Sequence, residues 1–104
     1  MKKDPEVALE VTKIFKLIKE ISPGKAVELR VPPYGAIQCS EGAIHRRGTP
    51  PNQVEMGADA LIHLAINPES WAVLVGKGKI RASGLASDLS KLFTQVSAKY
   101  HAGI

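Results

Sequence analysis

The stretch that decides the fold is Val31-Pro-Pro-Tyr-Gly-Ala-Ile-Gln-Cys39, continued by His45-Arg-Arg-Gly-Thr-Pro-Pro-Asn52 up to Glu55. Each of its two pairs of adjacent prolines removes backbone N–H donors and pushes the preceding residue toward extended geometry. The first pair is therefore expected to end a strand, and the second to lie in a loop. Tyr34-Gly35 and Glu41-Gly42 are turn signals between short apolar segments. The stretch is predicted to be strands separated by turns.

Short segments on either side of these breaks are predicted strands. Residues 26–31 alternate apolar and charged side chains, which is typical of a strand with one buried face. Residues 36–39 follow the first turn, and residues 43–47 are a third candidate. Residues 54–56 are predicted as a short strand or strand end. Because brief turns separate these segments, we expect an antiparallel meander.

Helices are predicted before and after the strands. The first begins at Asp4-Pro5-Glu6, where an N-cap, a proline at the first helical position and an acidic residue favour a helix start. It ends at Ser22-Pro23-Gly24. The later elements are expected at residues 58–67 (helix), 68–75 (short helix), 79–83 (strand) and from Ser87-Asp88 onward (helix). This order predicts an α+β fold, with helices packed on one mostly antiparallel sheet.

The bulk properties are those of a small basic protein. A chain of 104 residues is expected to form one domain over residues 1–104. Its net charge is +4, but no dense basic run is interleaved with aromatic residues, so we expect no specific nucleic acid partner. No apolar run reaches the length of a membrane span, and charges interrupt the N-terminus where a signal peptide needs apolar residues. We therefore expect a cytoplasmic protein with no integral membrane association.

Side chains capable of catalysis are scattered along the sequence. Cys39 is the only cysteine, which excludes a disulfide within the chain and a thiolate metal cluster. In a strand it is expected to be a small buried apolar residue rather than a nucleophile. The three histidines lack ligand-spaced partners, and His63, inside an apolar helix, is interpreted as a hydrogen-bonded interface residue. We predict no catalytic residue, no metal and no cofactor.

Polar groups gather in the second half of the opening stretch. An imidazole, an arginine fork, a hydroxyl and an amide could together hold a carboxylate or phosphate. The residues concerned are His45, Arg47, Thr49 and Asn52. The alternative interpretation is a surface turn with solvated arginines and polar side chains that stabilise the loop.

Large apolar residues are dense after residue 60. The default interpretation is that they form the core. The functional interpretation is that short helices leave a gap over the sheet, and that this gap takes an apolar ligand. The lining expected in that case consists of Leu61, Leu64, Trp71, Leu74, Ile80, Leu89 and Phe93.

Two segments resemble a bacterial branch of the sterol-carrier-protein-like family that is common among actinobacteria. That branch carries V-P-P-x-G-A-x-Q-C followed by H-x-R-G-T-P-P-N-x-V-E, and both patterns are present nearly unbroken from Val31 to Cys39 and from His45 to Glu55. Residues 67–89 also resemble the family's sequence of short helix, glycine turn, strand and apolar helix. The resemblance implies an α+β fold of about five strands with helices across one face.

The resemblance also implies a capacity to bind lipids or other apolar molecules between helices and sheet. Our first hypothesis is a small cytoplasmic binding protein without catalysis of its own, whose polar loop orients a ligand head group. The alternative is an accessory domain that binds a substrate or thiol cofactor beside a separate isomerase-type enzyme, with His45–Asn52 as its anion site. Nucleic-acid contact through the basic surface is a weaker third option. Wide apolar helix faces are compatible with a homodimer.

Overall fold

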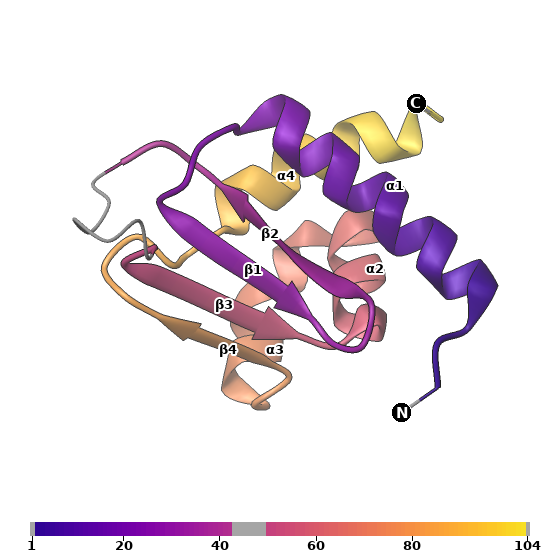
Figure 1. Cartoon of the computed structure of the whole chain (residues 1–104), viewed down its shortest axis with the longest axis horizontal. Helices are drawn as coiled ribbons and strands as arrows, with labels where there is room; N and C mark the ends of the chain where they lie inside the picture. Colours follow the sequence, from indigo (N-terminus) through magenta and orange to yellow (C-terminus); the bar gives the residue numbers. More distant parts are fainter. Residues whose placement is uncertain (1, 43–49, 104) are drawn as a thin grey trace.

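The computed structural model describes residues 2–42 and 50–103. Its strands form a sheet with helices packed against it (Figure 1). In chain order they are α1 (Pro5–Ile21), β1 (Val27–Val31), β2 (Gly35–Cys39), β3 (Asn52–Met56), α2 (Ala58–Ile66), the 3₁₀ helix η1 (Pro68–Ser70), α3 (Trp71–Gly76), β4 (Ile80–Ser83) and α4 (Ser90–His101). The predicted α+β class is confirmed.

The sheet is mixed, with strand order β2-β1-β3-β4. β1 pairs antiparallel with β2, and β3 pairs antiparallel with β4, but β1 and β3 are parallel. The predicted meander is therefore wrong at its third step, because β3 lies beside β1 and not beside β2. Because β2 runs back along β1, it ends beside the start of β1, where β3 also begins, and β3 therefore runs parallel to β1. The described residues form four strands instead of about five, and the predicted strand at 43–47 lies outside them.

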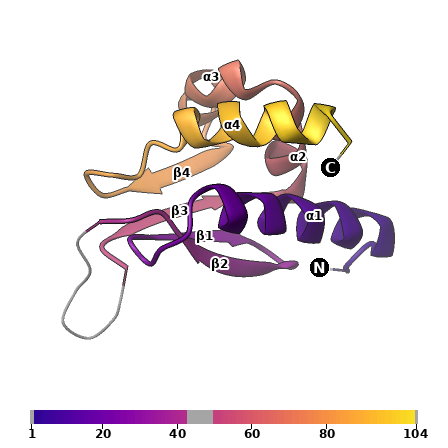
Figure 2. The same cartoon turned by 90° about the horizontal axis from the view of Figure 1, so that it is seen from above.

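The core lies between one face of the sheet and the helices. Val27, Leu29 and Val31 of β1 are fully buried on that face, while Arg30, on the opposite face, is exposed. α1, α2 and α4 contact one another in the helical layer, and Figure 2 shows them gathered together. The alternation seen in the sequence of β1 thus separates the core face of the sheet from the solvent face.

The predicted boundaries of α1 are confirmed by its caps. The Asp4 carboxylate accepts hydrogen bonds from the N–H groups of Glu6 and Val7 at 2.9 and 3.4 Å. At the other end, the Ser22 N–H donates to the carbonyl of Ile18. Leu9 differs from the rest of the apolar stripe, because it points to solvent and is 72% exposed.

The later helices depart from prediction in their details. The short helix predicted over residues 68–75 is divided into η1 and α3. α4 begins at Ser90, because the Asp88 carboxylate accepts the Ser90 N–H at 2.9 Å and residues 84–89 form a loop before it. Within the described residues, no helix is long and apolar enough to cross a membrane.

Candidate functional site

The seven apolar residues predicted to line a pocket come together in the structure. Six are buried, and Leu74 is partly buried against the same cluster. Trp71 and Phe93 stack with their ring centroids 6.2 Å apart and their planes at 29°. These residues are contiguous with core residues of β1 and α1. In this conformation these side chains pack on one another, so a ligand can bind among them only if they move apart.

The polar residues predicted to hold an anion are only partly described. His45, Arg47 and Thr49 lie outside the described residues. Asn52 is buried at the start of β3, where its Nδ2 donates to the Ala26 carbonyl at 3.0 Å and its Oδ1 accepts the Ala86 N–H at 2.9 Å. Both ends of this amide are therefore hydrogen-bonded to backbone. Direct contact between Asn52 and an anion requires these bonds to break.

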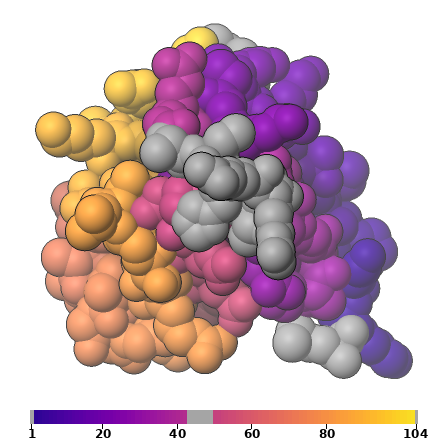
Figure 3. All heavy atoms as spheres, turned by 60° about the vertical axis from the view of Figure 1, so that its left-hand side comes forward, coloured from indigo at the N-terminus to yellow at the C-terminus, as the bar shows by residue number. Residues whose placement is uncertain are grey.

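A hollow of about 390 Å³ lies beside Asn52, at the end of the sheet where β1 and β3 begin and β4 ends. Figure 3 brings this end of the molecule forward. The walls are mostly small or apolar, and they come from four separate parts of the chain: Ala26, Gly42, Pro51, Asn52, Gly84, Leu85 and Ala86. Ala26 also belongs to the core, so the hollow and the core share a wall residue.

The loop between β4 and α4 forms one wall of this hollow. Gly84 has φ +110°, and a Cβ there would overlap the Asn52 side chain, so only glycine fits. The Ser87 hydroxyl donates to the Gly84 carbonyl at 2.8 Å and tightens the turn. Leu85 is fully exposed at the rim, whereas Leu89, at the end of the loop, is buried in the core. The loop thus separates the hollow from the predicted apolar lining.

Sequence reasoning missed this hollow. Gly42, Pro51 and Gly84 were each interpretable as turn residues, and nothing in their linear order indicates that they meet. Leu85 is part of the dense apolar segment, but it is exposed at the rim. The only local sign of the hollow in the sequence is Gly84 directly before the apolar Leu85 in a predicted loop.

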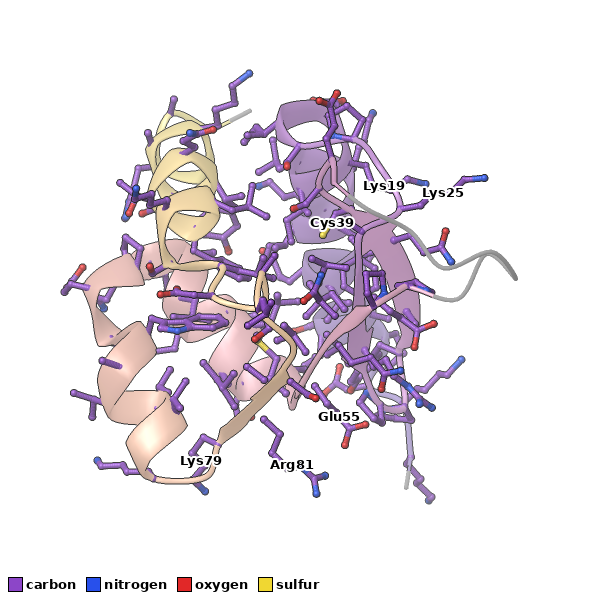
Figure 4. All side chains as sticks on the ribbon, turned by 90° about the vertical axis from the view of Figure 1, so that its left-hand side faces the viewer. Lys19, Lys25, Cys39, Glu55, Lys79 and Arg81 are labelled. Atoms are coloured by element: carbon purple, nitrogen blue, oxygen red, sulfur yellow. The ribbon has the colours of Figure 1, made fainter. Side chains whose placement is uncertain are left out.

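The opposite face of the sheet carries a row of charges. Arg81 on β4 pairs with Glu55 on β3 with an Nη2–Oε2 distance of 2.6 Å. Figure 4 labels both side chains. Arg30 on β1 is in register with Glu55, and Glu28 lies 4.0 Å from Arg30. A shallow hollow of about 270 Å³ lies over this row. The lining of this hollow contains two arginines and one glutamate, and Glu28, which lies beside Arg30 but outside the lining, offsets the remaining positive charge in part.

Cys39 and His63 lie where their sequence context indicated, on β2 and α2. Cys39 is fully buried, and burial raises the pKa of its thiol, while a hydrogen bond with Ser40 acts in the opposite direction. His63 is exposed, and its Nε2 lies 3.0 Å from the Ser70 hydroxyl, which joins α2 to η1. Among the described residues, no cluster of three or more His, Cys, Asp or Glu side chains could hold a metal ion.

Comparisons with known proteins agree with this fold. Residues 3–94 match the family described as bacterial SCP ortholog, and the chain belongs to that family. A solved structure titled "UbiJ-SCP2 Ubiquinone synthesis protein" superposes with a TM-score of 0.54 at 12% sequence identity, with 97% of each chain covered. A search of curated proteins finds no match. The predicted family is confirmed, and its narrower actinobacterial-type branch stays a prediction.

Proposed function

We propose that the chain is a single-domain, cytoplasmic binding protein for a lipid or another hydrophobic molecule, with no catalysis of its own. The observation that carries the proposal is the hollow beside Asn52, which has mostly apolar walls and shares Ala26 with the core. Its volume of about 390 Å³ falls within the range of small-molecule pockets. Membership of an SCP family supports the same class of function.

The ligand's apolar part would enter this hollow beside the loop of residues 84–88. Displacement of that loop brings the ligand toward Leu89, and from there to Phe93 and the rest of the predicted lining. Burial of apolar ligand surface supplies the affinity, at about 25 cal/mol per Å². Gly42 and Pro51 line this hollow, and His45, Arg47 and Thr49 lie between them in the sequence, which makes those three residues candidates for the head group.

Two measurements on the purified protein test the proposal. Native mass spectrometry should detect a bound lipid, and titration with a long-chain fatty acid should change Trp71 fluorescence in a saturable way. Ala86→Leu fills the hollow from its rim and should weaken binding at least tenfold. Ala98→Leu adds the same side chain at an exposed position on α4 and should leave binding unchanged. Absence of any bound lipid together with an unchanged fluorescence would contradict the proposal.

The accessory-domain alternative receives no specific support from the described residues. Three of its four anion-binding residues lie outside them, and the amide of Asn52 is hydrogen-bonded to backbone. A homodimer through apolar helix faces stays a prediction, which analytical ultracentrifugation would test.

A further inference from the structure

We propose that α3 and the turn that leads from it into β4 form a docking surface for an anionic lipid bilayer. This goes beyond ligand binding, because it concerns a different surface and a different partner. Two large apolar side chains of α3 are exposed, those of Val73 and Val75. Val73 is 56% exposed although it belongs to a helix that is otherwise packed on the core through Trp71 and Leu74.

The same segment is positively charged. Between Glu69 and Asp88 the sequence contains no acidic residue, and its charges are Lys77, Lys79 and Arg81. All three side chains are exposed. Glu55, on the neighbouring strand, pairs with Arg81, so the two lysines remain as the excess charge of this surface.

The exposed valines and the two lysines are close neighbours in the chain. α3 contacts β4 directly, and Figure 3 shows the chain from α3 through β4 as one continuous surface. In Figure 4, Lys79 and Arg81 project outward beside the end of α3. Lys77 directly follows α3 and Lys79 directly precedes β4, so both lysines belong to the turn that continues from the helix carrying the exposed valines.

A bilayer with acidic headgroups fits this combination. Exposed apolar side chains of this size bind a neutral bilayer weakly, and stable attachment takes a second, electrostatic signal. Lysine ammonium groups at the turn can contact lipid phosphates while the valines enter the boundary between headgroups and acyl chains. Binding should therefore require anionic lipid and weaken as salt is raised.

The other basic surface of the protein fits a bilayer less well. α1 carries exposed Lys13, Lys16 and Lys19, but Glu6 and Glu10 precede them and Glu20 follows them on the same helix. Leu9 is its one strongly exposed large apolar residue among those described. The α3–β4 surface combines cations with two exposed valines and lacks acids within its own segment, which favours it over α1.

Vesicle flotation tests the inference with the full chain. Vesicles of phosphatidylcholine mixed with phosphatidylglycerol should bind the protein, and vesicles of phosphatidylcholine alone should bind it at least tenfold less. Lys77→Glu with Lys79→Glu should reduce binding by roughly tenfold or more, since each lysine near an anionic surface contributes about fivefold. Val73→Ser with Val75→Ser should also reduce binding. All four positions are exposed, and circular dichroism checks that each variant is folded.

The matched control is Lys16→Glu with Lys19→Glu on α1, which changes the net charge equally and should keep most of the binding. An equal loss in this control would overturn the inference, because binding would then follow net charge alone. So would absence of binding to the mixed vesicles. If the valine variant binds as well as the unsubstituted protein, the surface is an electrostatic patch without apolar insertion, and the inference is wrong.

Discussion

The Asn52 Oδ1 atom accepts a hydrogen bond from the Ala86 N–H at 2.9 Å and so ties the start of β3 to the loop that follows β4. The same side chain donates to Ala26, just before β1. One buried amide thus holds together three segments that line the hollow. Buried backbone groups left without partners are costly, so this arrangement stabilises the end of the sheet.

Asn52→Ala should lower the free energy of unfolding by about 2–3 kcal/mol, because it leaves the Ala26 carbonyl and the Ala86 N–H without partners. Urea denaturation followed by circular dichroism measures the change. Gln53→Ala, on the exposed face of the same strand, should shift stability by less than about 0.5 kcal/mol. Equal stability of the two variants would show that the Asn52 bonds contribute nothing.

Gly84→Ala should destabilise the protein by about 2 kcal/mol or more, because φ is +110° and the added Cβ meets the Asn52 side chain. Thermal unfolding reports the loss. Gly76→Ala is the control, since a Cβ there meets nothing within 4 Å and the residue ends α3. That substitution should be neutral or stabilise by up to about 1 kcal/mol. Similar melting temperatures for both variants would show that Gly84 is not in close contact with Asn52.

Phe93→Leu should cost about 1–2 kcal/mol, because it removes the stacking partner of Trp71 and leaves space in a fully buried site. The emission of Trp71 should shift to the red as water approaches the ring. Phe15→Leu makes the same change at a half-buried position on α1 and should cost less, with no shift in emission. If emission is unchanged in Phe93→Leu, Trp71 is held by other contacts.

Stability should fall as pH rises above 9.0, the ordinary pKa of a cysteine thiol. Because burial raises the pKa of the Cys39 thiol, the protonated thiol contributes stability that is fully present below 9.0 and is lost as pH rises through the folded-state pKa. Cys39→Ala should therefore lose less stability over this range. Urea midpoints at neutral and alkaline pH measure the difference.

Tyr100 provides the control for that experiment. Its hydroxyl donates to Glu10 Oε2 at 2.6 Å, and this hydrogen bond raises the pKa of Tyr100 above its ordinary value of 10.0, with burial adding to the effect. Tyr100→Phe should therefore flatten the stability profile only above pH 10.0. If the stability of Cys39→Ala falls as much as that of the unsubstituted protein from pH 9.0 to 10.0, the Cys39 thiol does not cause the loss of stability in this range.

Much of the local structure could be predicted because it depends on neighbours in the chain. Asp4 and Pro5 define the start of α1, and alternation defines β1 to within one residue. The parallel pairing of β1 with β3 could not be predicted in this way. The apolar face of β3, with Val54 at its centre, could be buried equally well if β3 paired with β1 or with β2. Only the path of the whole chain decides which strand β3 pairs with.

The candidate site divides in the same manner. The seven apolar residues could be recognised as one buried group, because their spacing places them on the inner faces of helices and of β4. The hollow could not be predicted from the sequence, because its walls are mostly small residues from turns that are far apart in the chain and show no sequence pattern.

The stretch from Val31 to Glu55 by itself indicated the family, the first strand breaks and a short strand at residues 54–56, which in the structure begins two residues earlier as β3. These features could be predicted because prolines, glycines and alternation act over a few residues. Tertiary structure decided the strand order, the role of Asn52 and the place of the hollow. The physical reason is that strand pairing and buried hydrogen bonds depend on groups that are far apart in sequence and meet only when the chain folds.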